Sequence, residues 1–446
     1  MGKWKRTAVI TLALSVALLL SGCLFRSGEE LYALPRQPKE MYELQKAIDT
    51  LMTPGTAYSA PSGGANRQPV QLADLDGDGT DEAIVFLKTG GDMPLKACIL
   101  DNEGDGMKCI ATLEGDGAGF ATAEYAQIDG NPGLEIVLGR QISDQVLQAM
   151  SVYALRDGRV VELMSASYSA YTTCDLDADG STDLFLLRFN AEEENGGVAE
   201  YYRYTGEQIE REPEASMSAG AGPVKRILTG KVAGGAPAVF VASLCGEDSI
   251  VTDIFALRDK SFLNITTAGV EGTSAGTVRN YYVYGTDIDR DGVIELPQPI
   301  QLPTRGGAED AYWIIEWYKM DLYGRRTCET TTYHNYSGGW YVTLPNEWRD
   351  GLTISRSAEV SGVRGYVFSQ WYGDGREPEE LFTIYSFNGE GRDVLTVEDG
   401  RFLLKGKGDV SYAASLGPAA ASAGLTQEDL KEMFDFIWVD WNTGEV

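Results

Sequence analysis

Histidine is almost absent from this chain of 446 residues, which has a single one, His334. This scarcity disfavours catalytic triads with a histidine base and zinc sites with several histidine ligands. Serine and cysteine nucleophiles would also lack their usual base. Carboxylates are the remaining abundant catalytic groups, because the chain has 66 Asp and Glu residues. A pair of carboxylates is sufficient for glycoside hydrolysis.

Positive charge is also scarce: 37 Lys and Arg residues stand against the 66 acidic ones, which gives a net charge of −29 at pH 7. The acidic residues are spread along the chain and are not confined to a tail. We therefore expect no nucleic acid among the partners, because its phosphate backbone would be repelled. Cationic partners, above all metal ions, are favoured.

Cysteine is rare, with six residues in the chain. The five besides Cys23 are too few for a disulfide scaffold. Cys98 and Cys109 flank a predicted hairpin around residues 103–104. They would form either a disulfide across this hairpin or two isolated buried thiols.

Long apolar segments are missing except at residues 7–20, and this segment is shorter than the ~20 residues that a membrane-spanning helix needs. Three basic residues precede it, and a Ser-Gly pair directly precedes Cys23. The arrangement resembles the signal sequence of bacterial lipoproteins. The resemblance implies that residues 1–22 are a signal peptide and that a lipid on Cys23 holds the protein to the extracytoplasmic face of the cell membrane. The alternatives are an ordinary signal peptide followed by a chance cysteine, or a short membrane anchor.

An acidic nine-residue pattern recurs along the chain. Three strong copies have carboxylates at positions 1, 3, 5 and 9 and a glycine at position 6, and each adjoins a segment typical of a strand. Two weaker copies lie between them. We call the five copies the first loop (74–82), second loop (127–135), third loop (175–183), fourth loop (230–238) and fifth loop (287–295). They begin at residues 74, 127, 175, 230 and 287, which gives steps of 53, 48, 55 and 57 residues.

Short β-type segments separated by turn residues fill the space between the loops, about four to a repeat. This pattern is typical of the blades of a β-propeller, each of which buries its faces against its neighbours. We therefore expect a mainly β fold, with a propeller of five or more four-stranded blades over residues 67–337. A superhelical stack is the structural alternative. The fifth blade should be irregular, because Pro297 and Pro299 would interrupt its second strand.

The strong loops present a set of hard oxygen ligands, which suits Ca²⁺. Four carboxylates this close would repel one another, so a bound cation has a clear electrostatic role. An EF-hand is a different structure, with a glutamate at position 12 and flanking helices. Position 12 here is Val85, Leu186 or Gln298, and each loop leads into a β-type segment. The EF-hand interpretation therefore fails.

The loops resemble the FG-GAP and VCBS-type repeats of integrin-like propellers over residues 65–300. The resemblance implies that each loop joins the first two strands of a blade and holds a structural Ca²⁺, with position 7 contributing its backbone carbonyl. The implied metal ligands are Asp74, Asp76, Asp78, Thr80 and Glu82; Asp175, Asp177, Asp179, Ser181 and Asp183; and Asp287, Asp289, Asp291, Val293 and Glu295. The second loop carries weaker ligands, Asp129, Asn131 and Glu135, because Gln127 replaces its first Asp. The fourth loop has lost its ligands and should be free of metal.

The two ends of the chain lack the repeat. Residues 23–66 read as a lipid-anchored tether followed by a short helix at 40–52, with Met41, Leu44, Ile48 and Leu51 on one face. Residues 338–446 read as a small α+β domain. Its predicted strands are 339–344, 352–355, 365–370 and 381–387, and its last helix begins at Thr426, continues through an apolar stripe to Trp441, and has Asp429 placed for a capping box.

Tryptophan is concentrated after residue 310, with seven of the eight residues. Five of them would form either a sugar-stacking surface or a buried core: Trp313, Trp317, Trp340, Trp348 and Trp371. We expect the protein to be a membrane-anchored extracytoplasmic binding module whose propeller, stabilised by Ca²⁺, presents a protein- or glycan-binding surface. The alternative is an extracellular carboxylate-dependent polysaccharide hydrolase or lyase, whose catalytic pair the sequence does not single out.

Overall fold

The computed structural model describes residues 39–437, with gaps at 103, 105, 143–147, 190–196, 207, 268–275, 281–282, 305–310, 358–362 and 374. The predicted signal peptide, Cys23 and the tether up to residue 38 lie outside the described residues. No helix in the described part of the chain combines the length and apolar character that crossing a membrane requires.

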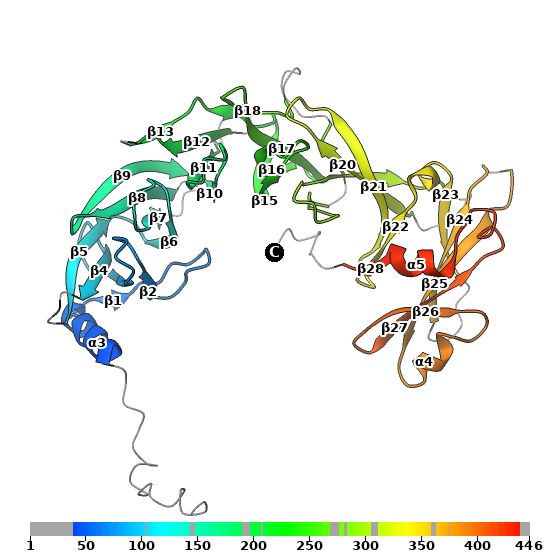
Figure 1. The fold of residues 1–446 in the computed structure, drawn as a ribbon, viewed down its shortest axis with the longest axis horizontal. Helices are drawn as coiled ribbons and strands as arrows, with labels where there is room; N and C mark the ends of the chain where they lie inside the picture. Colours follow the sequence, from blue (N-terminus) through cyan, green and yellow to red (C-terminus); the bar gives the residue numbers. More distant parts are fainter. Residues whose placement is uncertain are drawn as a thin grey trace, which may run out of the picture.

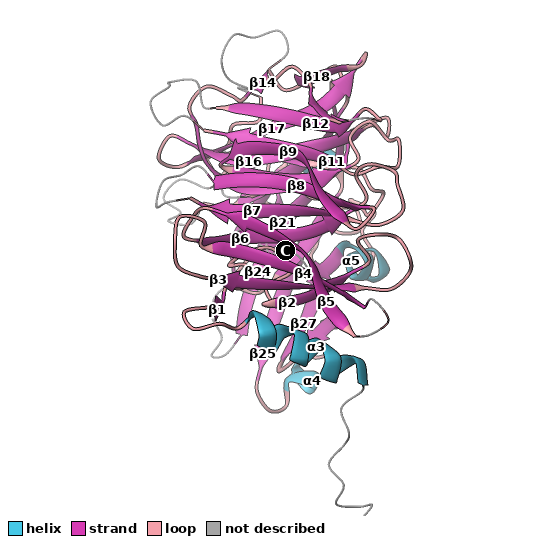
Figure 2. Cartoon of the chain, turned by 90° about the vertical axis from the view of Figure 1, so that its left-hand side faces the viewer, coloured by secondary structure: helices cyan, strands magenta, loops and turns pink. Residues whose placement is uncertain are grey.

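The described chain is mainly β and forms six antiparallel sheets of four or five strands. The sheets follow one another in chain order along an open arc (Figure 1). Seen from the side, their strands lie one above another in successive layers (Figure 2). The expectation of a mainly β fold is confirmed, and neighbouring sheets stack as the repeat predicts.

The first four sheets are antiparallel meanders of the same plan. Their innermost strands, β2, β6, β10 and β15, lie toward the inside of the arc (Figure 1). Sheet 1 contains β1 (Ala57–Tyr58), β2 (Val70–Ala73), β3 (Glu82–Lys88), β4 (Leu95–Asn102) and β5 (Met107–Gly115); sheet 2 contains β6 (Gly119–Ala126), β7 (Glu135–Gln141), β8 (Gln148–Arg156) and β9 (Arg159–Tyr168). Sheet 3 contains β10 (Ala170–Cys174), β11 (Asp183–Arg188), β12 (Val198–Tyr204), β13 (Ile209–Arg211) and β14 (Ala215–Ser216); sheet 4 contains β15 (Ala221–Lys231), β16 (Pro237–Cys245), β17 (Ser249–Arg258) and β18 (Ser261–Asn264).

Hydrophobic clusters span neighbouring sheets and hold the arc together. The second strand of a sheet is buried on both faces, which explains its unbroken apolar sequence. In β11, Phe185 packs toward sheet 4, whereas Leu184 and Leu186 join a cluster with sheet 2. Between sheets 1 and 2, the rings of Phe86 and Phe120 meet edge to face with centroids 5.0 Å apart. Truncating such a buried ring to alanine costs about 3–5 kcal/mol, so each interface contributes substantially to stability.

Helix α3 (Lys39–Leu51) covers the outer face of sheet 1. Its Leu44, Ile48 and Leu51 contact the buried cluster around β3 and β4, as the helical periodicity predicts. Met41 is 55% exposed, so the predicted apolar face begins one turn later.

Sheet 5 departs from the meander plan of the first four. It contains β19 (Leu296–Gln301), β20 (Trp313–Met320), β21 (Arg326–Asn335), β22 (Trp340–Leu344) and β28 (Phe434–Phe436). The prediction that two prolines interrupt its second strand is wrong, since β19 pairs with β20 along its whole length through both Pro297 and Pro299. Alternate residues of a strand direct their N–H groups to the same side, so both prolines lack a donor on the side away from β20. Among the described residues, the pairing on that side is limited to the bridge from Thr286 to Glu295.

Sheet 6 lies at the end of the arc. It contains β23 (Leu352–Arg356), β24 (Val363–Gln370), β25 (Glu379–Asn388), β26 (Phe402–Lys407) and β27 (Val410–Leu416), accompanied by the short helices α4 (Arg392–Leu395) and α5 (Gln427–Met433). The predicted domain boundary between residues 337 and 338 lies in the turn between β21 and β22, which pair within sheet 5. One hydrophobic cluster joins sheets 5 and 6.

The last helix begins as predicted and ends early. Thr426 and Asp429 form the expected capping box at the start of α5. The helix ends at Met433, and Phe434–Phe436 form strand β28 against β22, so the predicted continuation of the helical stripe is wrong at Phe434. The fully buried Phe434 ring packs against Trp340, 5.6 Å between centroids, and this contact outweighs local helical periodicity. Trp438 and Trp441 lie outside the described residues.

The tryptophans of this region divide between core and surface. Trp317 and Trp340 are 0% and 2% exposed, so they fill the interior and are not part of a sugar-stacking surface. Trp348, in a short 3₁₀ turn, packs against Phe382 at the edge of the cluster. Trp313 and Trp371 are partly exposed.

The thiols of Cys98 and Cys109 meet across the hairpin of β4 and β5. Both are free in this structure, and both contact the Thr112 hydroxyl, at 3.8 and 3.6 Å from oxygen to sulfur. The two cysteines lie near each other across the hairpin, but Cys109 is exposed, so the alternative of two isolated buried thiols is wrong for Cys109.

Candidate metal sites

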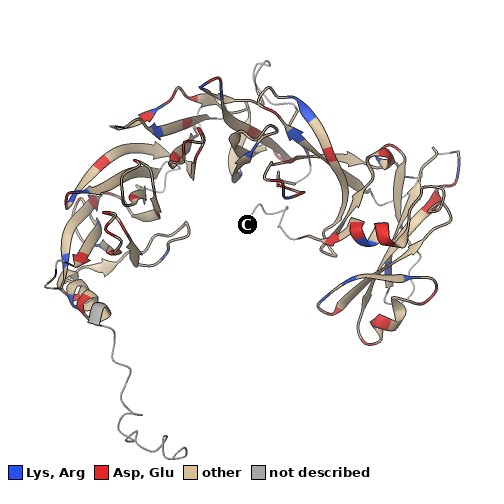
Figure 3. Ribbon diagram, viewed as in Figure 1, with Lys and Arg blue, Asp and Glu red and all other residues tan. Residues whose placement is uncertain are grey.

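The first three loops join the innermost strand of a sheet to its second strand, which the resemblance to FG-GAP repeats predicts. The fourth loop does so between β15 and β16, and the fifth precedes β19. Acidic residues lie on loops at the inside of the arc (Figure 3), and the fourth loop contributes none of them because it has no Asp or Glu. In each of the three strong loops, three carboxylates offer oxygens that all lie within 4.8 Å of one another.

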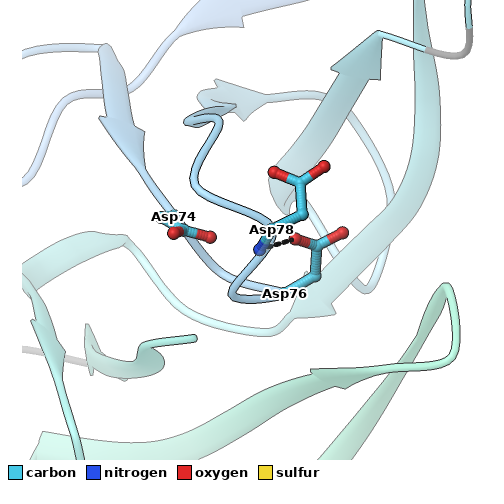
Figure 4. A group of neighbouring side chains, drawn as sticks. All are labelled: Asp74, Asp76 and Asp78. Carbon is cyan, nitrogen blue, oxygen red and sulfur yellow. Dashed lines mark hydrogen bonds between the residues drawn. The ribbon is translucent and has the colours of Figure 1, made fainter. Parts of the chain in front are cut away.

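The first loop is shaped by its own carboxylates (Figure 4). Asp74 accepts backbone N–H groups from Gly77 at 2.7 Å and Gly79 at 3.1 Å. Asp76 and Asp78 each accept the N–H two residues further along, at 3.0 and 2.7 Å. Both glycines have positive φ, 78° and 88°, which turns the loop tightly enough for the three side chains to converge. Among the described residues, no Lys or Arg forms an ion pair with this cluster.

Glu82 closes the first loop at position 9 and is 1% exposed. Its Oε2 accepts the Leu75 N–H at 2.7 Å, whereas Oε1 is buried without a hydrogen-bond partner in the described structure. Burial raises the pKa of Glu82 to about 7 against the effect of the Leu75 hydrogen bond, and the charges of Asp76, Asp101 and Asp74 raise it further. A divalent cation at Oε1 would offset both the lost hydration and the repulsion.

The third loop repeats this arrangement. Asp175 accepts the N–H groups of Asp179 and Gly180, both at 3.1 Å, and Asp177 accepts that of Asp179 at 3.2 Å. The position-9 carboxylate, Asp183, accepts the Tyr201 hydroxyl at 2.8 Å as well as a backbone N–H. Burial raises the pKa of Asp183 to about 6 in spite of these hydrogen bonds.

One basic side chain lies at the margin of the third loop. The Nη1 of Arg203 is 3.7 Å from Asp177, while its Nε donates to Glu212 at 2.8 Å. Arg203 therefore interacts with two carboxylates, one in the third loop and one outside it. The oxygens of Asp175, Asp177 and Asp183 still converge on one another.

The fifth loop has the same backbone turn and a different electrostatic environment. Asp287 accepts the N–H groups of Asp291 at 3.0 Å and Gly292 at 2.8 Å. The Nζ of Lys319, from β20, donates to Asp289 at 3.1 Å and to Asp291 at 2.6 Å. The attraction of these carboxylates raises the pKa of Lys319 above its usual value despite burial. The ammonium group of Lys319 therefore lies among the carboxylates of the fifth loop.

Burial also dominates at Glu295, the position-9 residue of the fifth loop. It is 0% exposed, and its Oε2 accepts the Ile288 N–H at 2.8 Å. Its pKa is raised to about 7 although Lys319 lies nearby, because lost hydration outweighs the attraction of the ammonium.

The second loop lacks a convergent carboxylate cluster in the described structure. The Gln127 amide donates to the carbonyls of Asn131 and Gly133, at 2.5 and 2.9 Å. Gly133 is at position 7, whose carbonyl would face a metal in the implied ligand set. Asp129 is paired with Arg156, and this pairing and local hydrogen bonds keep its pKa below the usual value against the effect of burial.

The remaining residues of the second and fourth loops differ in role. Glu135 accepts the backbone N–H groups of Ile128 and Asp129 at 2.7 and 3.2 Å, and burial raises its pKa to about 7. In the fourth loop, the position-9 residue is the buried Ala238, and a Val232 to Ala236 backbone bond of 2.9 Å holds the turn.

Adjacent loops are joined by backbone hydrogen bonds near position 1 of one and position 8 of the next. The Leu134 N–H donates to the Asp74 carbonyl at 2.9 Å, and the Thr182 N–H donates to the Gln127 carbonyl at 2.7 Å. The Ile294 N–H donates to Lys231 at 2.9 Å. The loops are therefore part of the junctions between sheets, so their conformation affects how neighbouring sheets pack.

Three basic residues that the repeat pattern did not reveal lie beside the loop carboxylates: Arg156, Arg203 and Lys319. Leu184 of β11 pairs with Tyr202 of β12, and Leu296 of β19 pairs with Tyr318 of β20. Arg203 and Lys319, each one residue further along, therefore lie opposite Asp183 and Glu295. They lie 20 and 24 residues after those carboxylates. A basic residue at this spacing is the only sequence signal of the contact, and strand register is needed to interpret it.

His334 has a structural setting. It is 7% exposed, and its ring nitrogens lie 3.0 Å from the Thr332 hydroxyl and 3.3 Å from the Tyr336 hydroxyl. Burial holds the pKa of His334 well below its usual value, so the ring is neutral at physiological pH. This environment favours a hydrogen-bonding role in the interior of sheet 5.

Two surface hollows lie away from the loops. One, of about 600 Å³, adjoins β14 and β18 and contains Glu214, Arg258 and Asn264. The other, of about 480 Å³, lies beside α5 and contains Trp348 and Asp429. Each combines apolar surface with polar groups, which is suitable for binding a polar ligand.

No model of a protein family matches the chain, and no curated protein matches it either. The resemblance to FG-GAP and VCBS repeats therefore stays a prediction that depends on the acidic loops.

Proposed function

We propose that the protein is a membrane-anchored extracytoplasmic binding module in which calcium stabilises a propeller-type stack of β sheets. The main support is the convergence of three carboxylates in each of three loops, two of them placed before the second strand of sheets 1 and 3 and one before β19, the first strand of sheet 5. Calcium accepts such oxygen ligands in flexible geometry. The buried, unpartnered Oε1 of Glu82 adds a group that a cation would satisfy.

The propeller form of the proposal is supported by the shared plan of the first four sheets. Their innermost strands lie on the inside of the arc, and successive sheets stack face to face. This radial order is the one that propeller blades have. An arc of sheets leaves its ends and inner rim as surfaces for a protein or glycan ligand, and the hollow beside Trp348 is one candidate near one end.

Thermal unfolding of the full chain in detergent, with millimolar Ca²⁺ or with a chelator, tests the calcium role. Extracellular modules bind calcium at roughly 10⁻⁴–10⁻³ M, so a concentration of about 10 mM would fill the sites. We expect a higher midpoint with calcium and none of this increase in an Asp76→Asn, Asp177→Asn double variant. Equal midpoints in calcium and chelator would refute the proposal.

Lipid anchoring at Cys23 is tested separately by metabolic labelling with a radioactive fatty acid. The wild-type protein should incorporate label and fractionate with membranes. A Cys23→Ala variant should lose the label while its folding, followed by the calcium-dependent midpoint, is unchanged. Equal labelling of the variant would refute the anchor.

The polysaccharide hydrolase or lyase is the competing function. Glu82, Glu135 and Glu295 have pKa values raised to about 7, but each closes a loop with one oxygen held by a backbone amide. This placement favours a structural role over proton transfer. Turnover of a glycan that disappears on changing one Asp or Glu outside the loops would favour the enzyme.

A further inference from the structure

The position opposite the last loop carboxylate differs in charge from sheet to sheet. In sheet 1, Ala83 pairs with Leu100, so the next residue, Asp101, lies opposite Glu82. In sheet 2, the same register places Ala154 opposite Glu135. The same position holds Arg203 in sheet 3 and Lys319 in sheet 5. The strong loops therefore face an anion in sheet 1 and a cation in sheets 3 and 5, whereas the weaker second loop faces a neutral residue.

Lys319 lies among four carboxylates and is only 13% exposed at its side chain. Its Nζ is 2.6 Å from Asp291, 3.1 Å from Asp289 and 3.5 Å from Glu295. These three residues are positions 5, 3 and 9 of the fifth loop, the side chains that the resemblance assigns to calcium. The fourth carboxylate, Glu329, is 3.4 Å away on the neighbouring strand β21.

We propose that the ammonium of Lys319 replaces calcium in the fifth loop, so this loop is stabilised by a cation of the chain itself. The inference rests on the proposed calcium role of the other strong loops. An ammonium donates up to three hydrogen bonds and neutralises part of the carboxylate charge. A divalent ion bound to the same oxygens would lie a few ångströms from Nζ and be repelled by it.

In the second loop, a different pair of side chains supplies the positive charge and the hydrogen-bond donors. Arg156 reaches Asp129 from the end of β8, and the Gln127 amide donates to the position-7 carbonyl of Gly133. Both groups present positive or donor atoms where a metal would present its charge. The second loop therefore holds no calcium, and the ion is confined to the first and third loops.

This distribution gives the arc an uneven response to calcium. The backbone bond from Ile294 to Lys231 joins the fifth loop to sheet 4, and Lys319 keeps that junction formed at any calcium concentration. The bond from Leu134 to Asp74 joins sheet 2 to the first loop, whose carboxylates have no ion pair among the described residues. Calcium therefore controls the N-terminal junctions more than the C-terminal one.

Counting bound calcium on the full chain by equilibrium dialysis tests the inference. The wild type should bind two ions per chain, and Lys319→Met, which keeps the apolar stem, should bind three. Lys319→Arg retains the charge and should bind two. Three ions on the wild type, or an unchanged count in Lys319→Met, would overturn the inference while leaving the calcium role intact. No ion on any of these chains would instead overturn the proposed function.

A second pair of variants keeps the test independent of whether Lys319→Met folds. Asp76→Asn in the first loop should lose one ion relative to the wild type. Asp289→Asn at the equivalent position 3 of the fifth loop should lose none, because Lys319 is its partner. Loss of an ion from Asp289→Asn would overturn the inference.

Discussion

The first loop and the fifth loop have the same four acidic positions and the same backbone turn, yet their surroundings differ in sign. Glu82 faces the strand end that carries Asp101, whereas Glu295 faces Lys319. In both loops the position-9 glutamate buries an Oε1 without a hydrogen-bond partner in the described structure. The Oε1 of Glu82 lies beside further negative charge, whereas in the fifth loop the Lys319 ammonium contacts three carboxylates and lies 3.5 Å from the Oε1 of Glu295. An identical ligand pattern thus specifies the shape of a turn, while the neighbouring strand determines which cation stabilises it.

The largest difference that we expect between the two loops is in the free energy of unfolding lost when one of their glycines is replaced by alanine. A Cβ on Gly77 would lie 2.4 Å from Pro132 in the second loop, at a φ of +78°, whereas Gly292 has a φ of +85° and open space around it. We expect Gly77→Ala to cost about 3 kcal/mol, from strain plus overlap, and Gly292→Ala about 1 kcal/mol. Urea unfolding measures both. Equal losses would show that the first loop does not depend on its contact with the second.

Transferring the cation from one loop to the other should remove calcium stabilisation. We expect Asp101→Lys to place an ammonium beside Glu82 and to abolish the contribution of the first loop, about 2 kcal/mol at 10 mM Ca²⁺ for a site of sub-millimolar affinity. Asp101→Asn is the control and should keep most of it. The measurement is the difference in unfolding free energy with and without calcium, and an undiminished difference in Asp101→Lys would contradict the account.

The pH dependence of stability should separate Glu82 from Glu295 in the presence of calcium. Each has a folded-state pKa of about 7 against a usual value of 4.5. The folded protein therefore holds protons that the unfolded chain has lost, and the free energy of unfolding without calcium falls as pH rises from about 4.5 to about 7. Calcium should remove the contribution of Glu82 to this fall, because the ion favours the carboxylate.

The matching variants are Glu82→Gln and Glu295→Gln, compared by thermal unfolding across this pH range. Both should flatten the calcium-free profile. Only Glu82→Gln should also reduce the response to calcium at pH 7.5. A similar loss of response in Glu295→Gln would show that the fifth loop binds the ion as well.

The smallest expected effect concerns the third loop, which is intermediate between the other two. Arg203 lies 3.7 Å from Asp177 and is held by Glu212. We expect Arg203→Gln to strengthen calcium binding by less than about 1 kcal/mol, since such a partly exposed ion pair is weak. Calorimetric titration would measure the change, and weaker binding in the variant would contradict this assignment.

Local features of the sequence predicted the elements that depend on local chemistry. Alternating carboxylates with a glycine at position 6 fold their own turn, because each side chain accepts a backbone N–H two to five residues away. The capping box at Thr426 and the face of the N-terminal helix are local in the same sense.

Features that depend on contacts between residues far apart in the sequence could not be predicted from local sequence patterns. Lys319 enters the fifth loop only through the register of β19 with β20, and Pro297 fits its strand because one side of β19 has little pairing. Phe434 leaves the helical pattern because β22 offers a pairing edge and Trp340 a packing partner. In each case a tertiary contact determined the outcome.

The most direct test of the central claim is a crystal structure grown in calcium, with anomalous scattering used to locate the ions. The account predicts an ion within coordination distance of Asp74, Asp76 and Glu82, a second in the third loop, and none in the fifth loop beside Lys319. An empty first loop at saturating calcium, or an ion in the fifth loop with Lys319 displaced, would contradict it.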